Sequence, residues 1–293
     1  MPKICVIGSM NMDLCVESPR APVMGETVLG RGFMASPGGK GANQAVAAAR
    51  LGARVTMVGC VGGDAFGARL TENLRANGVD TGCVRVTGEA PTGAAVILLH
   101  GGDNCIVVDP GANMRLTPGD VEEDVIAGSD MLVLQLEIPP ETVRRAMELA
   151  RARGIPVLLN PAPARRMPAE FLAMADVLTP NESECEALTG CADMEEGARA
   201  LVRMGIPRVV VTLGSKGVLF CEGGRVMHRP ARQVKAVDTT AAGDAFTGAL
   251  AVSLAEGKGF GEAVDFAQGA AALTVTRRGA QEAMPGRAEV VAC

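Results

Sequence analysis

The stretch MLVLQLEIPPETVRRAMELARARGIPVLLN, residues 131–160, decides the fold class. It contains two short apolar runs, Met131 to Leu136 and Ile155 to Leu159, on either side of the longer segment Pro140 to Arg153. Short apolar runs predict strands that are buried on both faces, and the longer segment between them predicts a helix. A strand, a helix and a second strand in this order predict two parallel strands joined by a right-handed crossover.

The alternation of strands and helices continues in both directions from this stretch. Expected strands cover residues 3–8, 55–61, 177–179 and 208–213, and expected helices cover residues 40–51, 64–77, 181–188, 194–204, 242–255 and 261–276. Residues 218–221 and 225–228 predict a hairpin around Gly223 and Gly224. Repeated alternation predicts an α/β fold, in which a mainly parallel central sheet is covered by helices on both faces.

Two β-rich segments do not fit the alternation. Residues 12–36 hold short β-like pieces separated by prolines and glycines, and residues 84–109 hold further apolar runs. We expect these two segments to form a small β-sheet outside the main sheet, placed as a lid. Residues 1–293 show no internal repeat and no low-complexity linker, so we expect one α/β domain that carries this lid.

The composition limits the partners of the chain. The 293 residues are 48% hydrophobic but only 2% aromatic, and the formal net charge is −5. A mildly acidic chain without a basic run is a poor partner for nucleic acid, because phosphate binding needs cations. No apolar, uncharged stretch reaches the length of a membrane span, about 18 residues, without glycines. We therefore expect neither a nucleic acid partner nor a membrane partner.

The nine cysteines are scattered along the chain. No two of them form a CxxC pair, which argues against a structural zinc site, and their odd number argues against a disulfide framework. We interpret them as reduced, mostly buried residues of a cytosolic protein. The first residues lead into a five-residue apolar run and not into the apolar region of a signal peptide, so we expect a cytoplasmic location.

The segment Asp238-Thr-Thr-Ala-Ala-Gly-Asp244 carries the strongest chemical signal. Its small residues precede an Ala-rich helix, so backbone N–H groups can approach an anion closely where the helix dipole adds positive potential. A carboxylate at Asp244 makes sense there if it accepts the proton of a hydroxyl that attacks a phosphoryl group. Taken alone, the segment is better explained by a helix start, with Asp238 or Thr240 as the cap.

Two further segments near the N-terminus carry polar groups. Ser36-Pro-Gly-Gly-Lys-Gly-Ala-Asn-Gln44 lacks the spacing of a Walker A loop, but Lys40 and Asn43 supply directional groups for several hydroxyls. The alternative is a plain glycine-rich turn. Asn11 and Asp13 follow the first strand, where they suit two vicinal hydroxyls or form an Asx-turn.

Three segments follow expected strands in the second half of the chain. Glu137 lies just past a strand, at the edge where ligands of parallel sheets bind. Asn181-Glu-Ser-Glu184 opens a helix, so capping explains it, although Glu184 also suits water bound to Mg²⁺. Thr212-Leu-Gly-Ser-Lys-Gly217 turns sharply after a strand and either lays amides along phosphates or is a simple turn.

Two other enzyme classes fit poorly. His100 and His228 are the only histidines, and neither has a Ser, Cys or Asp constellation nearby, which argues against a His-based triad. The first strand leads to Gly8-Ser-Met-Asn and not to a GxGxxG motif, which argues against a nicotinamide-dependent dehydrogenase.

In their order along the chain, these segments resemble the motifs of the ribokinase-like (PfkB) carbohydrate kinase family. The resemblance covers nearly the whole chain, and an ordered set of motifs is far more specific than any one of them. The set comprises Gly8-Ser-Met-Asn-Met-Asp13, Pro37-Gly-Gly-Lys-Gly-Ala-Asn-Gln-Ala45, Gln135-Leu-Glu137, Asn160-Pro-Ala-Pro-Ala164, Thr179-Pro-Asn-Glu-Ser-Glu184, Thr212 to Gly217, Asp238 to Asp244 and Val275-Thr-Arg-Arg-Gly-Ala280. The resemblance implies a three-layer α/β/α sandwich with a small β-sheet lid, and it favours the functional interpretation of each segment.

The resemblance also implies a role for each matching residue. Asp244 is the expected base that deprotonates the primary hydroxyl of a sugar, and the amides of Ala241, Ala242 and Gly243 are expected to form the anion hole for the transferred phosphoryl group. The sugar is expected to contact Asn11, Met12, Asp13, Gly39, Lys40, Gly41, Asn43, Glu137 and Asp244. ATP is expected to contact Asn181, Thr212, Leu213, Gly214, Ser215, Lys216, Gly217, Gly243, Asp244 and Gln268.

Two metal ions are implied as well. Mg²⁺ is expected near Glu184, which would position it through water. A monovalent cation, usually K⁺, is expected beside the anion hole, near Asp238, Thr240, Thr274, Arg277, Gly279 and Ala283. Two positions depart from the family, because Ala283 stands where Ser is common and Gln268 stands where His or Asn is frequent. The first departure removes one side-chain oxygen and leaves backbone oxygens to bind the cation.

The implied activity is the ATP-dependent phosphorylation of D-ribose at its 5-hydroxyl, which gives ribose 5-phosphate and ADP. The alternatives are a kinase for another sugar, deoxyribose or a nucleoside, and a non-catalytic regulator that binds a sugar. The near absence of aromatic residues argues against a nucleoside, whose base usually stacks on one. The lid of the family often pairs between subunits, which implies a homodimer.

Overall fold

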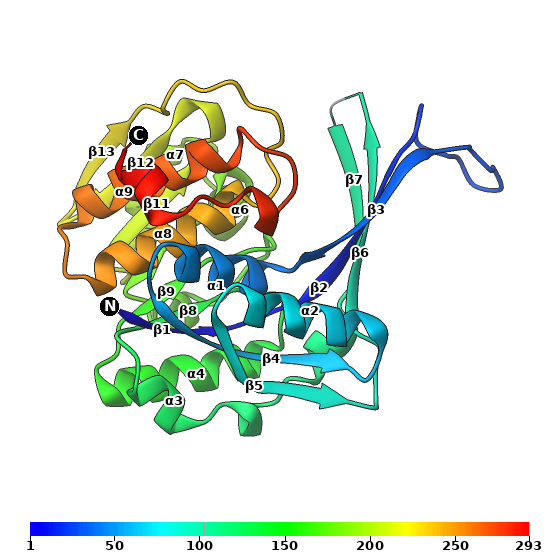
Figure 1. Ribbon diagram of the computed structural model, residues 1–293. Coiled ribbons are helices and arrows are strands. Elements are labelled where there is room, and N and C mark those ends of the chain that lie inside the picture. The colour runs from blue at the N-terminus through cyan, green and yellow to red at the C-terminus, as the bar shows by residue number, and fades with distance from the viewer. Residues whose placement is uncertain (102, 293) are drawn as a thin grey trace.

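The computed structural model describes residues 1–101 and 103–292, so Cys293 lies outside the described residues. Nine strands form a central sheet in the order β13-β12-β11-β10-β9-β8-β1-β4-β5, and four strands form a second sheet in the order β3-β2-β6-β7. Figure 1 shows helices on both faces of the central sheet, while the second sheet stands away from this body. The expected three-layer α/β/α sandwich with a small lid sheet is confirmed.

The elements have the following bounds. The central sheet contains β1 (Lys3–Ile7), β4 (Arg54–Gly62), β5 (Val79–Thr87), β8 (Met131–Leu134), β9 (Val157–Leu159), β10 (Val177–Leu178), β11 (Arg208–Thr212), β12 (Val218–Glu222) and β13 (Arg225–Arg229). The lid sheet contains β2 (Asn11–Glu17), β3 (Arg31–Gly38), β6 (Gly93–His100) and β7 (Asp103–Asp109). The α-helices are α1 (Lys40–Arg50), α2 (Ala65–Ala76), α3 (Glu123–Ala127), α4 (Pro140–Arg153), α5 (Ala169–Leu172), α6 (Glu182–Thr189), α7 (Met194–Arg203), α8 (Ala242–Ala255), α9 (Phe260–Thr274) and α10 (Arg287–Val291). Short 3₁₀ helices include η3 (Gly214–Lys216) and η4 (Gln281–Ala283).

The central sheet is parallel from β11 to β5, and β12 and β13 add an antiparallel hairpin at one edge. A sheet covered on both faces buries both rows of side chains, so successive residues of a strand enter different cores. In β1, Ile4 and Val6 pack into one core, and Cys5 and Ile7 pack into the other. Helices α1, α2, α8 and α9 supply the first core, and α3, α4, α6 and α7 supply the second.

The lid sheet takes strands from both β-rich segments. β2 pairs antiparallel with β3 and in parallel with β6, and β6 pairs antiparallel with β7. One expected boundary is wrong, because residues 84–87 belong to the end of β5 and pair with β4 in the central sheet. Composition does not separate a strand of the central sheet from a strand of the lid sheet, since a β-rich run does not indicate which of the two sheets it joins.

Two further properties of the described residues concern the helices and the cysteines. None of the helices in residues 1–101 and 103–292 is long and apolar enough to cross a membrane. The eight cysteines in this part of the chain are free, and those that are buried are Cys5, Cys60, Cys185 and Cys221. Cys105, by contrast, is exposed on the lid.

Candidate active site

The candidate residues gather at the carboxyl ends of the parallel strands. Ser9 follows β1, Glu137 follows β8, Asn160 follows β9 and Asn181 follows β10. Parallel strands end on the same side of a sheet, so these residues share one edge, which is where open α/β sheets bind ligands. The N-terminal turns of α1 and α8 reach this edge as well, because their side chains contact each other and Asn160 there.

Asp244 lies at the centre of this edge, in the first turn of α8, and is only 7% exposed. Its Oδ2 accepts a hydrogen bond from Asn43 Nδ2 at 2.9 Å, and its Oδ1 accepts one from Gln44 Nε2 at 2.9 Å. Each oxygen of an ionised carboxylate accepts about two hydrogen bonds. Each oxygen of Asp244 therefore keeps a lone pair for a hydroxyl of a ligand.

The N-terminus of α8 has no side-chain cap and begins at a residue in the left-handed conformation. Helices α2, α6 and α7 begin with a side-chain cap, but Ala241 caps α8 without one and has a φ of 58°. This left-handed conformation strains a non-glycine residue by about 1–3 kcal/mol and is typical of functional sites. The amides of Gly243 and Asp244 have no hydrogen-bond partner within the described part of the chain, and a Cβ at Gly243 would meet no atom within 4 Å. These amides are free to donate to an anion.

The expected anion hole differs in one detail. The amide of Ala242 donates to the carbonyl oxygen of Thr239 at 3.3 Å, so it is already engaged within the turn. The 3.3 Å distance is at the long end for such a bond, and the turn holds it weakly. The amides of Ala241, Gly243 and Asp244 have no such partner within the described part of the chain and therefore offer the better donors of this turn.

A chain of amide side chains supports Asp244 from behind. Asn43 Oδ1 accepts from Gln281 Nε2 at 3.0 Å, and Gln281 Oε1 accepts from Asn73 Nδ2 at 2.6 Å. On the other side, Gln44 Oε1 accepts from Gln135 Nε2 at 2.7 Å. Asn43 keeps one of its two N–H donors, so it still suits a sugar hydroxyl.

Glu137 connects β1 with the start of α1. Ser9 Oγ donates to Glu137 Oε2 at 2.5 Å, and the amide of Lys40 donates to the same oxygen at 3.3 Å. Asn11 opens β2, where its Oδ1 accepts from Asn113 Nδ2 at 2.7 Å. The Asx-turn alternative for Asn11 is therefore wrong, because the residue lies in a strand that pairs on both sides.

Charges of both signs meet around Asp13. Burial, followed by the negative charges of Glu137, Asp244 and Glu282, raises the pKa of Asp13 to about 7, although Lys40 opposes this. Burial lowers the pKa of Lys40, but the surrounding carboxylates outweigh burial and raise it overall. Lys40 therefore stays charged among these acids and can neutralise part of their charge or that of a phosphate.

Two glycines at the start of α1 allow it to pack against the segment that joins β1 to β2. Gly39 has a φ of 89°, which L side chains rarely adopt, and a Cβ there would lie 2.6 Å from the amide nitrogen of Asn11. A Cβ at Gly41 would lie 2.6 Å from the amide nitrogen of Ser9. The close approach brings Lys40 near Asp13 of the lid strand β2. Met12 is fully buried in the core, and no surface of this residue is exposed to a sugar.

Most of the expected ATP residues form a second group at the start of α6 and in the loop that begins at the end of β11. Asn181 caps α6, forms a parallel bridge with Thr212, and exchanges hydrogen bonds of 2.8 Å with Glu184. The loop after Thr212 turns through η3, and its Lys216 Nζ pairs with Glu182 Oε1 at 3.1 Å. The remaining expected members of the loop are Leu213, Gly214, Ser215 and Gly217, and the Leu213 amide donates to Gly217 O at 2.8 Å.

Gln268 lies on α9 and contacts the segment Arg229 to Pro230, against which Gly217 of this loop also packs. Its Nε2 donates to the carbonyl oxygens of Arg229 and Pro230 at 3.4 Å and 3.3 Å. The amide nitrogen is thus partly engaged with the segment that follows β13, and its carbonyl oxygen remains available to a ligand.

Glu184 faces the same charged cluster as Lys40. It is 5% exposed, and burial raises its pKa, while a hydrogen bond from the Asn181 amide and the charge of Lys40 lower it. The Asn181 amide engages Oε2, which leaves Oε1 to a water or to the water shell of a metal ion.

Asp238 organises the loop that was expected to hold a monovalent cation. Its Oδ1 accepts from the Thr240 amide at 2.9 Å and its Oδ2 accepts from the Gly279 amide at 3.0 Å. The helix-start interpretation is therefore wrong, since neither Asp238 nor Thr240 caps α8. Burial raises the pKa of Asp238, but these hydrogen bonds outweigh burial and lower it, so the carboxylate stays charged.

None of the other expected cation ligands adds a second carboxylate, so they offer only hydroxyl or carbonyl oxygens. The hydroxyl of Thr274 is buried and donates at 2.9 Å to the carbonyl oxygen of Ala270 within α9. The guanidinium of Arg277 pairs with Glu289, and Ala283 is buried without a side-chain oxygen. No group of three or more His, Cys, Asp or Glu side chains in residues 1–101 and 103–292 is placed to hold a metal ion by itself.

Comparison with known proteins assigns the chain to a family. The family described as pfkB family carbohydrate kinase matches residues 1–287. The chain belongs to this family. Ribokinase from Bacillus subtilis is 47% identical over 99% of this chain and 98% of the relative, and deoxyribokinase from Salmonella typhi is 38% identical over 96% and 95%. The structure of Arabidopsis thaliana ribokinase complexed with ribose and ATP covers 99% of this chain and 98% of its own, with a TM-score of 0.92 and 36% identity.

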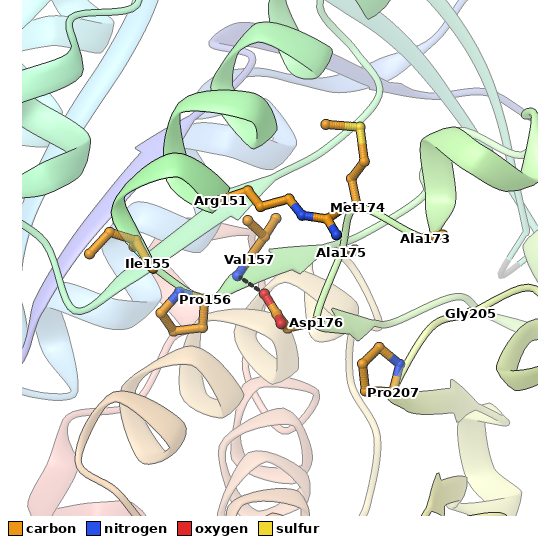
Figure 2. Close-up of a pocket in the computed structure, with 11 residues that line it drawn as sticks. Arg151, Ile155, Pro156, Val157, Ala173, Met174, Ala175, Asp176, Gly205 and Pro207 are labelled. Atoms are coloured by element: carbon orange, nitrogen blue, oxygen red, sulfur yellow. Dashed lines mark hydrogen bonds between the residues drawn. The ribbon is translucent and has the colours of Figure 1, made fainter.

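This carbohydrate kinase also has a pocket far from Asp244, at the opposite edge of the sheet. The pocket holds about 380 Å³ and lies at the starts of β9 and β10, beside Arg151 and Asp176. Figure 2 shows the Asp176 carboxylate directed at the Val157 amide, which donates to Oδ2 at 2.8 Å. The carboxylate thus ties two strands together, and none of the expected site residues reaches this pocket. The candidate active site is therefore formed by the converging polar side chains around Asp244 and not by this pocket.

Proposed function

We propose that this chain transfers the γ-phosphoryl group of ATP to the 5-hydroxyl of D-ribose and releases ribose 5-phosphate and ADP. The observation that carries the proposal is the setting of Asp244, whose buried carboxylate is held by Asn43 and Gln44 at the uncapped start of α8. A carboxylate beside amides that can bind an anion suits phosphoryl transfer to a hydroxyl. The ribokinase relatives support D-ribose as the acceptor.

The sugar is held by polar groups from three elements. Asn11 and Asp13 approach from β2, Lys40 and Asn43 approach from α1, and Glu137 approaches from the end of β8. Together they supply amide donors, carboxylate acceptors and one ammonium group, a set that suits several neighbouring hydroxyls. The lid strand β2 thus contributes directly to the sugar site, which couples binding of the sugar to exclusion of water.

Asp244 then acts as the base. Its free lone pair accepts the proton of the 5-hydroxyl while that oxygen forms a bond to the γ-phosphorus and the bond from phosphorus to ADP breaks. The amides of Ala241, Gly243 and Asp244, at the positive end of α8, neutralise charge on the transferred group, with Ala242 shaping the turn. Asn181, the loop from Thr212 to Gly217, and Gln268 hold the nucleotide.

The residues present fit Mg²⁺ that arrives with the nucleotide. Glu184 offers one buried carboxylate oxygen and would hold the ion through water, while the phosphates supply most of its ligands. When bound, the ion supplies neutralisation of charge on the phosphates. The fit for K⁺ is weaker, because Asp238 is the one carboxylate among the expected ligands and Ala283 offers only its carbonyl. We propose that K⁺ binds beside Asp238 through backbone oxygens.

We further propose that residues 1–293 act as one kinase domain in the cytoplasm, whose lid pairs with the lid of a second copy. Apolar side chains exposed on β3, β6 and β7 support this pairing. Among other functions, a deoxyribose kinase is supported by the deoxyribokinase relative. A sugar-binding regulator without catalysis is disfavoured, since it would need neither Asp244 nor the open amides of α8.

The proposal is tested by the ATP-dependent phosphorylation of a panel of sugars by the native chain and by Asp244→Asn. We expect D-ribose to give the highest kcat/KM, ahead of 2-deoxyribose and nucleosides. Because a positioned base contributes about 10²–10⁴-fold, Asp244→Asn should lower kcat at least about 100-fold. A preference for deoxyribose or a nucleoside would contradict D-ribose as the acceptor. A kcat of Asp244→Asn within tenfold of native would exclude Asp244 as the base.

A further inference from the structure

Three amide side chains form a buried cluster behind the carboxylate of Asp244. The amide cluster consists of Gln44 on α1, Gln135 after β8 and Asn160 after β9. Gln44 and Gln135 are fully buried, and Asn160 is 9% exposed. None of the three was assigned a role from the sequence, and the fully buried Gln44 is positioned to act on a ligand only through another residue.

Gln44 is held at both ends of its amide. Its Nε2 donates to Asp244 Oδ1 at 2.9 Å and to Asn160 Oδ1 at 3.2 Å, and its Oε1 accepts from Gln135 Nε2 at 2.7 Å. Asn160 is fixed in turn by its own bond to the Thr179 carbonyl at 2.8 Å. If the Gln44 amide were flipped, its carbonyl oxygen would face the carboxylate of Asp244. Its NH₂ group would then face the NH₂ group of Gln135, and neither could accept a hydrogen bond. Only one orientation of Gln44 satisfies the cluster.

Gln135 is committed to this one contact. Its Nε2 donates to Gln44, while its Oε1 has no hydrogen-bond partner among the residues that the structure describes. A buried acceptor without a partner costs about 1–3 kcal/mol. The fold therefore keeps a costly side chain at this position, and the contact it gains is the one that fixes Gln44.

We propose that Gln44 is a positioning residue that fixes the plane of the Asp244 carboxylate for proton transfer, with Gln135 holding Gln44 in its working orientation. The proposal rests on the role of Asp244 as the base. Asn43 alone holds one oxygen and leaves the carboxylate free to turn about its Cβ–Cγ bond. Bonds to both oxygens remove this rotation and direct the remaining lone pairs toward the hydroxyl.

The test compares single-turnover rates of ribose phosphorylation in Gln44→Met, in Gln135→Met and in the same changes combined with Asp244→Asn. Met keeps the approximate volume of Gln and removes the donors. Loss of alignment at a reacting group can lower the rate roughly 10–100-fold, so we expect a loss of rate of that size in Gln44→Met. We expect its KM for ribose to stay within about threefold of native. Gln135→Met should show a smaller loss in the same direction.

The double variants separate positioning from general damage to the fold. If Gln44 acts through Asp244, Gln44→Met lowers the rate of the native chain but not that of Asp244→Asn. A merely structural role would lower both rates by the same factor, and that result overturns the proposal. If Gln44→Met does not fold, the same comparison is made with Gln135→Met. We expect Gln135→Met to fold, because the substitution also removes a buried acceptor that has no partner.

Thr142→Val is the matched control. Thr142 is fully buried on α4, on the opposite face of the sheet, and its hydroxyl donates to the Leu116 carbonyl at 2.7 Å. We expect this variant to lose stability and to keep the native rate. A native rate in folded Gln44→Met would also overturn the proposal while leaving Asp244 as the base. An Asp244→Asn variant that stays active would instead overturn the proposed function itself.

Discussion

Asp13 shows how the site changes the chemistry of a single residue. Burial, and then the charges of Glu137, Asp244 and Glu282, raise its pKa from the usual 3.8 to about 7, while Lys40 opposes them. The folded chain therefore keeps a proton on Asp13 that the unfolded chain releases. This protonation contributes to the free energy of unfolding. The contribution is fully present below about pH 4 and is lost as the pH rises to about 7.

We expect Asp13→Asn, which removes this titration, to gain stability relative to the native chain as the pH rises. The difference between their free energies of unfolding should widen by roughly 2 kcal/mol between pH 5 and pH 7 and then level off. Urea unfolding of both proteins across this pH range measures the difference. A constant offset is expected from the amide itself, so a difference that does not change with pH would show that Asp13 is not protonated in the folded chain.

The residues that sequence reasoning could find are those whose motif is local. Asp244 and Lys40 sit within short runs of small residues that allow an anion site or a hydroxyl site, and the ordered set of motifs favours these sites over a plain helix start or turn. Ser9 and Gln281 carry no such pattern, because their partners Glu137 and Asn43 lie 128 and 238 positions away in the chain. Only the folded structure brings these pairs together, and a lone Ser or Gln in a sequence is compatible with many environments.

At the scale of elements, length and periodicity decided which predictions held. The expected helices at 40–51 and 242–255 match α1 and α8 within one residue at each end. The short helices α3, α5 and α10 have four or five residues each, which is too few for a periodic pattern. The cap of α8, by contrast, could not be predicted from the sequence, since Asp238 and Thr240 are both typical cap residues and the helix uses neither.

The open start of α8 allows a substitution that separates folding from catalysis. Gly243 is the second residue of the helix, and a Cβ there would meet no atom within 4 Å. Ala suits a helix better than Gly by about 0.5–1 kcal/mol, so Gly243→Ala should be at least as stable as the native chain. Its methyl group would occupy space above the amides, so we expect kcat to fall by at least about tenfold. Thermal unfolding and steady-state kinetics measure the two effects.

Gly261→Ala is the matched control for this substitution. Gly261 is the second residue of α9, and a Cβ there would approach Arg229 no closer than 3.9 Å. The gain in helix propensity should therefore be similar, while kcat stays native. Full activity in Gly243→Ala would place the phosphoryl group elsewhere than over the first turn of α8.

At the scale of the whole molecule, the lid sheet is the part that an isolated chain leaves least covered. It stands away from the body, and its outer strands β3 and β7 are unpaired edges within the described structure (Figure 1). Large apolar side chains are exposed along it and its loop, namely Val23, Met24, Leu29, Phe33, Met34, Val96, Ile106, Val107 and Val108. Apolar patches beside open sheet edges mark surfaces that associate. The two β-rich segments that interrupt the alternation of strands and helices thus form both the proposed cover of the sugar site and the proposed contact with a second copy.

This view predicts that one charge on the lid separates the subunits. Val107 on β7 is 72% exposed in the single chain, and Val291 on α10, away from the lid, is 71% exposed. We expect the native chain to have twice the mass of one 30.1 kDa chain and Val107→Lys to shift toward the single chain, because a buried ammonium at the contact costs several kcal/mol. Val291→Lys should remain a dimer, since it introduces the same charge at equal exposure outside the lid. Light scattering coupled to size-exclusion chromatography measures all three masses. A single-chain mass for the native protein, or a dimer of Val107→Lys as stable as that of Val291→Lys, would exclude pairing through this face of the lid.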